Sequence, residues 1–181
     1  MFKEKAQIMD AKSMGRAIAR ITYEIIERNH GVANLCILGI KSRGGEIARR
    51  IAEKIGEIEG NTVPVGILDI TPFRDDLKQT DGIEDTSEIP FAVTGKKIIL
   101  VDDVMYTGRS TRAALDAVMA RGRPRAVQLA VLIDRGHREL PLRPDFVGKN
   151  VPTSHDEEIR VMLVERDGVD EVSIYTKKRE A

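Results

Sequence analysis

The hydrophobic pattern of the chain alternates between two periods. In some stretches apolar residues recur every three or four positions, the spacing of one face of a helix. These stretches predict helices at 10–29, 45–58 and 111–122. Between them lie continuous apolar runs, which are typical of strands buried on both faces. These runs predict strands at 35–40, 96–103 and 126–134.

Buried strands that alternate with amphipathic helices indicate βαβ units. We therefore expect an α/β fold with a mostly parallel sheet flanked by helices. Residues 62–70 predict a further strand, which Pro64 places at a sheet edge or a bulge. Segments 159–165 and 171–176 predict a terminal antiparallel hairpin. Because no repeat or linker interrupts the pattern, we expect one domain over residues 1–181.

Three of the predicted strands are followed by unusual loops. KSRGG follows the first strand, a long polar stretch at 71–91 follows the second, and DDVMYTGRS follows the third. Ligands of parallel sheets bind beyond the carboxyl ends of the strands, so these loops predict the site. The 71–91 stretch is longer than an ordinary connection, so we expect it to be functional or disordered and mobile without ligand. One interpretation is a lid that carries Arg74 and Lys78 and excludes water, and the alternative for these two residues is solvated loop charges.

Composition narrows the class of protein without naming a ligand. Lys plus Arg and Asp plus Glu number 29 each, so the formal net charge is zero and only a local patch could favour nucleic acid. The one cysteine, Cys36, lies in an apolar run and excludes a disulfide framework. No signal-peptide pattern or bilayer-length apolar run occurs, so we expect a cytoplasmic protein with no membrane association.

The acidic pair after the third strand suggests a specific chemistry. Asp102 and Asp103 are followed by a Thr-Gly-Arg-Ser run at the start of a helix. Gly108 permits close approach of the backbone, and the helix N-terminus with the hydroxyls of Thr107 and Ser110 can cradle an anion. Ionised carboxylates accept hydrogen bonds from sugar hydroxyls or bind a divalent cation. The run therefore predicts a site for a phosphorylated ribose.

Other phosphate motifs fit less well. Residues 39–46 read GIKSRGGE, which lacks the Lys and Ser/Thr of a Walker loop, and no G-x-G-x-x-G fingerprint occurs. Solvated acids in an ordinary turn remain an alternative for Asp102 and Asp103. The apolar strand before them and the helix entry after them favour the binding site.

At this point the chain resembles a known family. The run IILVDDVMYTGRST resembles the phosphoribosyl-pyrophosphate (PRPP) signature of type I phosphoribosyltransferases. GIKSRGGEIARRIAE, VPVGILDITPFRDDL and LIDRGHRELPLRPDFVGKNVPTS resemble the family of pyrimidine operon attenuators that are also uracil phosphoribosyltransferases. The likeness extends over about residues 5–175, and the stretch 132–154 discriminates best because many salvage enzymes share the PRPP motif. It implies the type I phosphoribosyltransferase fold, with a small hood at 135–160.

The resemblance also implies a reaction, uracil plus PRPP giving UMP plus pyrophosphate with Mg²⁺. Asp102, Asp103 and Arg43 would be catalytic, and Mg²⁺ would be held mainly through the substrate, with no metal site of the protein's own. A cis peptide is expected at Ser42–Arg43, and Arg135 with the backbone near Ile159 would meet the base. PRPP and nucleotide binding would fall to Ser42, Arg43, Gly44, Asp102, Asp103, Val104, Met105, Tyr106, Thr107, Gly108, Arg109 and Ser110. Tyr106 stands where purine-specific relatives carry an acid, which favours a pyrimidine.

The resembled family also binds a leader mRNA under the control of UMP or UTP. We expect a basic surface separate from the active site, presented by a homodimer or higher homo-oligomer. Its candidate residues are Arg16, Arg20, His137, Arg138, Arg143 and Lys149. Two alternatives stay open, a salvage phosphoribosyltransferase without a regulatory role and a regulator whose catalysis is vestigial.

Overall fold

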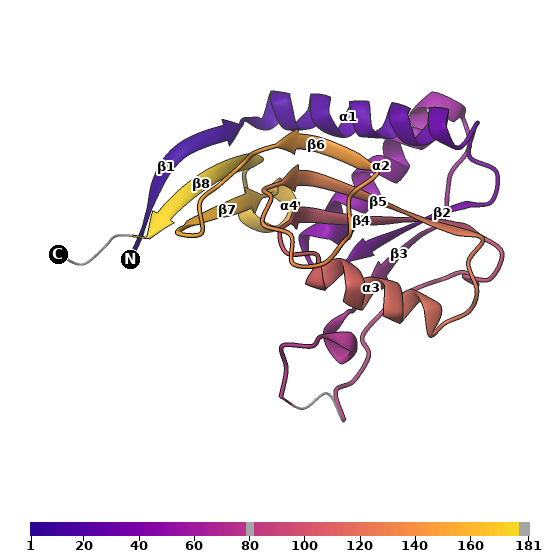
Figure 1. Cartoon of the computed structure of the whole chain (residues 1–181). Helices are drawn as coiled ribbons and strands as arrows, with labels where there is room; N and C mark the ends of the chain where they lie inside the picture. Colours follow the sequence, from indigo (N-terminus) through magenta and orange to yellow (C-terminus); the bar gives the residue numbers. More distant parts are fainter. Residues whose placement is uncertain (79–81, 178–181) are drawn as a thin grey trace.

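The fold is built on two β-sheets. The computed structural model describes residues 1–78 and 82–177. A five-stranded parallel sheet has the order β3-β2-β4-β5-β6, and a three-stranded antiparallel sheet has the order β1-β8-β7. In Figure 1 the smaller sheet lies at the end toward which the parallel strands point. The elements are β1 Phe2–Met9, α1 Ala11–Arg28, β2 Leu35–Ile40, α2 Arg43–Glu59, β3 Val65–Leu68, a 3-10 turn Thr71–Phe73, β4 Lys97–Met105, α3 Arg109–Met119, β5 Ala126–Asp134, β6 Phe146–Asn150, β7 Glu157–Met162, α4 Val164–Asp167 and β8 Glu171–Lys177.

The parallel sheet is covered on both faces, as its continuous apolar runs predict. Ile37 and Ile99 pack into the apolar cluster of α1 and α2. Their neighbours Leu38 and Leu100 turn to the opposite face and pack with α3. Figure 1 shows the same layering, with α1 and α3 on opposite sides of the sheet. The predicted α/β class is therefore confirmed.

The observed boundaries refine the predicted ones. Helix α1 begins after Asp10, where a capping box forms: Ser13 N donates to Asp10 Oδ1 over 2.8 Å, and Asp10 N donates to Ser13 Oγ over 3.0 Å. Strand β5 has the predicted bounds, whereas β4 continues to Met105 because it stays paired with β5 as far as the Met105–Asp134 pair. Asp102 and Asp103, predicted at the end of this strand, thus lie within it, and Asp103 is two residues before its last residue.

The short strand β3 is at a sheet edge, as Pro64 predicts. It covers Val65–Leu68, which is less than the predicted 62–70. On its outer side the backbone of Glu88 forms an isolated bridge and exchanges two 2.9 Å hydrogen bonds with Ile67. Residues 79–81 of the predicted lid lie outside the described part of the chain.

Two strands escape prediction from the sequence. Strand β1 is almost wholly exposed and its residues do not alternate between apolar and polar, and β6 is only five residues long with Gly148 in its middle. The predicted hairpin is confirmed as the antiparallel pair β7 and β8, but α4 joins them instead of a tight turn, and β1 adds a third strand. Within residues 1–78 and 82–177, no helix combines the length and apolarity needed to cross a bilayer.

The burial of Leu100 gives a test of the core. We expect Leu100→Ala to lower the free energy of unfolding by about 2–5 kcal/mol, because it leaves a cavity against α3. Met119→Ala, on the exposed side of α3, should change it by less than about 0.5 kcal/mol. Urea unfolding followed by circular dichroism measures both, and equal losses would contradict this picture of the core.

Candidate active site

The carboxyl ends of β2, β3 and β4 meet at one hollow. Its volume is about 450 Å³. A smaller hollow of about 110 Å³ continues it under the start of α3 and shares Asp102, Val104 and Ser110 with it. The lining residues of the larger hollow are Ile40, Lys41, Ser42, Asp69, Ile70, Thr71, Arg74, Asp102, Asp103, Val104 and Ser110. The three loops singled out by the sequence therefore meet where a ligand of a parallel sheet is expected.

Glycines bring the first loop directly onto the acidic pair. A Cβ on Gly44 would lie 2.6 Å from Val101 O and 3.2 Å from Asp102 Cα. A Cβ on Gly39 would lie 2.5 Å from Gly44 O. No side chain fits in either gap, so the start of α2 rests against the backbone of β4. This contact sets the distance between the loop after β2 and the carboxylates.

The loop itself departs from one expectation. Every peptide bond within the described ranges is trans, so the predicted cis bond at Ser42–Arg43 is wrong. The tight turn is made by Ser42, whose φ is +99°. Lys41 and Ser42 line the hollow, but the Arg43 side chain leaves it: Arg43 Nη2 donates to Asp167 Oδ1 of α4 over 2.8 Å. The catalytic role of Arg43 thus stays a prediction.

The two carboxylates have different surroundings. Asp103 N donates to Asp102 Oδ1 over 2.9 Å, and Val104 N donates to Asp103 Oδ1 over 2.8 Å. Asp102 is half-buried, and its carboxyl lies next to Asp103. Burial of that carboxyl, together with the charge of Asp103 beside it, raises the pKa of Asp102 well above its usual range. Ionising Asp102 therefore costs free energy. A ligand that donates hydrogen bonds to its carboxylate would offset this cost.

The helix entry is open as an anion cradle. Gly108 is the N-cap of α3 with φ +94°, and no side chain caps the helix. Apart from Arg109 N, its first-turn N–H groups have no side-chain cap in the described part of the chain and can serve a ligand. Arg109 and Ser110 are exposed, and Thr107 Oγ1 accepts a 3.3 Å hydrogen bond from Arg109 N. Met105 is buried in the core, so only its backbone can serve the site.

A second segment holds this cradle from behind. Glu139 N and Leu140 N donate to Thr107 O over 2.9 and 3.2 Å. Arg138 Nη1 donates to Tyr106 O over 2.8 Å, and the same guanidinium bonds Asp134. The backbone of 106–107 is therefore set by residues 134–140 as well as by β4.

Sequence reasoning missed Asp69. Although burial by itself raises the pKa of Asp69, hydrogen bonds from Thr71 and Thr86 outweigh it and hold that pKa well below the usual range. Thr86 Oγ1 also accepts a 2.6 Å hydrogen bond from Lys41 Nζ. This network ties the far end of the 71–91 segment to the loop after β2. Its position could have indicated a role, because Asp69 is next to the last residue of the strand predicted at 62–70.

The predicted base contacts lie in a wall beside the cradle. Arg135 is buried, and its guanidinium carbon lies 4.0 Å from the centre of the Tyr106 ring. It donates to Thr153 Oγ1 over 2.9 Å and to Glu157 O over 2.7 Å. Ile159 packs its side chain into the core, so only its backbone could meet a base. Arg135 thus braces this wall, and both assignments stay predictions.

The predicted RNA residues divide into two groups. Arg16, Arg20, Arg143 and Lys149 are exposed, but Arg20 is also tied to the protein by its own hydrogen bonds. Arg20 bonds the carbonyl groups of β6, His137 bonds Thr153 O and lies 4.1 Å from the His155 ring, and Arg138 holds Tyr106. Arg138 therefore contacts the phosphate cradle, and the expected separation from the active site does not hold for it.

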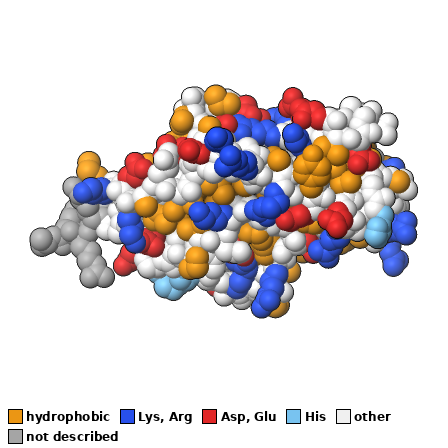
Figure 2. All heavy atoms as spheres, turned by 90° about the horizontal axis from the view of Figure 1, so that it is seen from above, with side chains coloured by type: hydrophobic (Ala, Val, Ile, Leu, Met, Phe, Trp, Pro, Cys, Tyr) orange, Lys and Arg blue, Asp and Glu red, His pale blue; other side chains and the backbone are white. Residues whose placement is uncertain are grey.

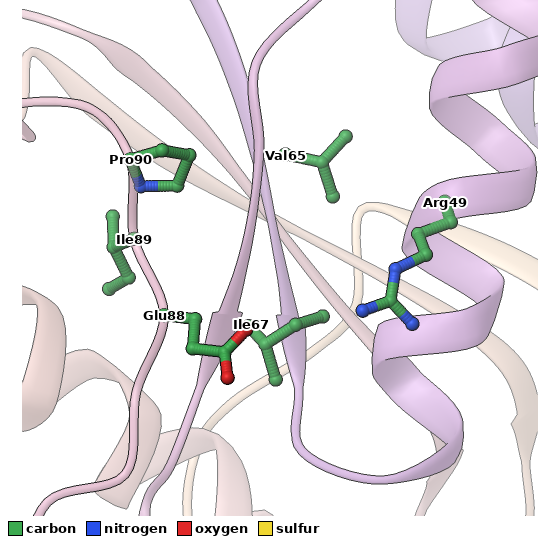
Figure 3. Close-up of a pocket in the computed structure, with 6 residues that line it drawn as sticks. All are labelled: Arg49, Val65, Ile67, Glu88, Ile89 and Pro90. Carbon is green, nitrogen blue, oxygen red and sulfur yellow. The ribbon is translucent and has the colours of Figure 1, made fainter.

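Another hollow lies outside this constellation. Figure 3 shows it between β3, α2 and the segment around Pro90. Its volume is about 390 Å³. Its lining is Arg49, Val65, Ile67, Glu88, Ile89 and Pro90, which includes none of the predicted site residues. The chemistry that the sequence predicts therefore gathers at the carboxyl ends of the strands.

Comparison with known proteins assigns the class. The model of the phosphoribosyl transferase domain family matches residues 4–162, so the chain belongs to the phosphoribosyltransferases. Relatives named "Bifunctional protein PyrR" match nearly full length. That of Pelotomaculum thermopropionicum is 58% identical, covering 96% of this chain and 97% of the relative. That of Acetivibrio thermocellus is 60% identical, covering 94% of each. Within the family, the chain is of the PyrR type.

Solved structures agree with the fold. A hypoxanthine-guanine phosphoribosyltransferase from Bacillus anthracis superposes with a TM-score of 0.73 at 17% identity, covering 98% of this chain and 100% of the other. A mutant of the hypoxanthine phosphoribosyltransferase from Trypanosoma cruzi, in a ternary substrates complex, gives 0.76 at 12% identity, covering 94% and 95%. These likenesses confirm the type I phosphoribosyltransferase fold.

The raised pKa of Asp102 predicts a stability gain on its removal. An acid with a raised folded pKa binds more protons folded than unfolded, so its contribution to stability falls as the pH rises above the unfolded pKa of about 4. Asp102→Asn, whose amide oxygen can still accept from Asp103 N, should therefore be more stable than the wild type at neutral pH.

The difference should shrink as the pH approaches about 4. Urea unfolding of the ligand-free protein at a series of pH values measures it. Asp116→Asn, exposed on α3, is the control and should show no such trend. A loss of stability in Asp102→Asn at neutral pH would contradict the assignment of Asp102 as an acid that ionises at a cost.

Proposed function

We propose that the protein catalyses the transfer of phosphoribose from PRPP to uracil, giving UMP and pyrophosphate. The observation that carries the proposal is the junction of β4 and α3. There an open helix N-terminus lies next to two adjacent carboxylates in one hollow. A phosphate and a ribose held side by side fit this arrangement. Membership of the phosphoribosyltransferase family supports the reaction.

The roles follow from position. Asp102 and Asp103 accept hydrogen bonds from the ribose hydroxyls, and these donors offset the cost of ionising Asp102 beside Asp103. The backbone of 106–110 takes the 5′-phosphate with the hydroxyls of Thr107 and Ser110. The backbone of 42–44 and Lys41 receive the pyrophosphate, because the loop after β2 lines the hollow beside the carboxylates.

The step needs little covalent help from the protein. The bond between ribose C1 and the pyrophosphate oxygen breaks as C1 bonds uracil N1, and the N1 proton passes to the departing pyrophosphate or to water. Positive charge develops on the ribose during this step, and negative charge develops on the leaving group. Cationic and N–H donors in the loop after β2 stabilise that leaving group. The described part of the 71–91 segment is held over the site by the 2.7 Å Arg109–Asp75 ion pair, which suits exclusion of water from a centre that hydrolysis would destroy.

Mg²⁺ fits the donors at this site. Magnesium prefers oxygen ligands and keeps several from water and substrate phosphates. Asp69, Asp102 and Asp103 line the hollow, although no group of three or more such side chains within 1–78 and 82–177 is close enough to hold a metal alone. We therefore assign the ion mainly to the oxygens of PRPP, where it would neutralise pyrophosphate charge.

Uracil is the base that the site favours. Tyr106 presents no acid to a purine N7, and its ring lies against Arg135. A flat pyrimidine could lie beside this pair, with backbone groups near Ile159 completing its contacts. Residues 1–181 would act as one domain, because one apolar cluster joins side chains of both sheets, with 71–91 as the lid and 135–160 as the hood.

We also propose binding of a leader mRNA that is promoted by UMP or UTP. Exposed Arg16, Arg143 and Lys149 offer phosphate contacts. Figure 2 shows Lys and Arg side chains interspersed with acidic ones on one face, so a single chain offers only a weak basic field. A homodimer or larger assembly would join such patches into a larger basic surface. With a transcript as its partner, the protein would act in the cytoplasm.

The simpler alternative is a salvage enzyme with no RNA partner. It fits less well because near-full-length relatives carry the name bifunctional. One contact in the structure also favours coupling between nucleotide binding and RNA binding. Arg138, in the segment next to Arg143, bonds the phosphate cradle at Tyr106. A nucleotide in the cradle can thus affect the proposed RNA-facing segment, and RNA must then affect the nucleotide equally.

Asp103→Asn tests the enzymatic proposal. We expect the rate of UMP formation from uracil and PRPP to fall by about tenfold or more, because an interaction with the reacting ribose is lost. The fold should survive, since Asp103 is only partly buried. Turnover is measured by UMP release, with Asp116→Asn as the control. Near-wild-type turnover would remove Asp103 from the site.

Arg143→Gln and Lys149→Gln test the RNA proposal. Each lost phosphate contact should weaken leader-RNA binding and reduce the log–log salt slope by roughly one. UMP synthesis should be preserved, because neither side chain lines the hollow. Gel-shift titrations with and without UMP measure affinity, and Lys54→Gln on α2 is the control. If the wild type binds no leader RNA, the salvage alternative stands.

A further inference from the structure

Arg43 occupies an unexpected place for a residue next to a pyrophosphate loop. It is the first residue of α2, directly after Ser42, which lines the hollow. Its guanidinium instead reaches α4, in the connection between β7 and β8, and Nη2 donates to Asp167 Oδ1 over 2.8 Å. The loop thus lines the hollow at Ser42, whereas the side chain of Arg43 is bonded to α4.

The carboxylate of Asp167 is anchored independently of Arg43. Its Oδ2 accepts a 2.8 Å hydrogen bond from Leu163 N, and this bond, with the Arg43 guanidinium, lowers the pKa of Asp167. Helix α4 is itself held to α2, because Arg50 bonds both Glu165 and Asp170. Asp167 is therefore a stationary anion, and only Arg43 is free to leave the pair.

The pair leaves the arginine incompletely satisfied. Arg43 Nε is buried and has no hydrogen-bond partner in the described structure. Arginine reaches its strongest interactions through two parallel N–H bonds to a carboxylate or a phosphate. One bond to Asp167 with a buried N–H unused is a weaker arrangement than a phosphate could offer.

We propose that Asp167 is a positioning residue that holds Arg43 away from the pyrophosphate subsite and competes with pyrophosphate for it. This inference rests on the proposed transferase function. When PRPP enters, its pyrophosphate draws Arg43 from Asp167, and after transfer Asp167 reclaims the arginine and promotes release of the leaving group. This competition makes the binding of PRPP and of pyrophosphate weaker than it would be without Asp167. It leaves the affinity for UMP unchanged.

Asp167→Asn isolates the charge. The asparagine oxygen can still accept from Leu163 N, but the anion that competes for Arg43 is gone. Pyrophosphate with Mg²⁺ should bind roughly two- to fivefold tighter, the range expected for loss of one partly exposed ion pair. The KM for PRPP should fall by a similar factor. The affinity for UMP, which lacks a pyrophosphate, should stay unchanged.

Matched variants separate competition from a structural role. Glu165→Gln removes an anion from the same helix, but one that pairs with Arg50, and should leave pyrophosphate affinity unchanged. In an Arg43→Gln background, Asp167→Asn should have no further effect on that affinity. Calorimetric titration measures each variant beside the wild type. Unchanged or weaker pyrophosphate binding in Asp167→Asn, or equal tightening without Arg43, would overturn the proposal.

A measurement on the wild type covers the case in which a variant does not fold. The side-chain Nε–H resonance of Arg43 in ¹⁵N-arginine-labelled protein should shift with pyrophosphate and Mg²⁺, and not with UMP. A resonance that pyrophosphate leaves unmoved rejects the exchange of partners. Failure of the transferase proposal looks different: the wild type would form no UMP from uracil and PRPP.

Discussion

The contact between the start of α2 and the backbone of β4 is the constraint on which the site depends. Gly44 leaves no room for a Cβ beside Val101 O and Asp102 Cα, so the loop after β2 and the acidic pair occupy one corner. A side chain there would push the two loops apart. Both loops must reach one PRPP molecule. The close approach of their backbones is therefore required before the side chains of the two loops can act on the same ligand.

That proximity has an electrostatic cost which ligand binding offsets. Asp102 is partly buried beside Asp103, where α2 packs against β4, and both burial and the like charge raise the pKa of Asp102. For Asp69 the balance is the opposite. Hydrogen bonds from the hydroxyl and backbone groups of Thr71 and Thr86 lower the pKa of Asp69 by more than burial raises it. The site thus contains one carboxylate that the protein satisfies and another that it leaves to its ligand, a division typical of functional sites.

The same corner is linked to the rest of the molecule through basic side chains. Arg138 joins the backbone at Tyr106 to the segment 134–140, and Arg43 joins the loop after β2 to α4. Each arginine connects a ligand-binding loop with a neighbouring segment, so occupancy of the loop can alter that segment. A regulator that reports nucleotide levels to an RNA needs such a connection, and a plain salvage enzyme does not.

The sequence by itself determined the alternation of helices and strands, because buried strands and amphipathic helices leave different periods. It also located the run Asp-Asp followed by Thr-Gly-Arg-Ser at the junction of a strand and a helix, because that run encodes local backbone structure. It did not reveal β1 or β6, since an exposed strand and a five-residue strand carry little apolar signal. Asp69, the trans Ser42–Arg43 bond and the partners of Arg43 and Arg138 were decided only by tertiary structure. Those features depend on which residues from distant segments come together, and no local pattern records that.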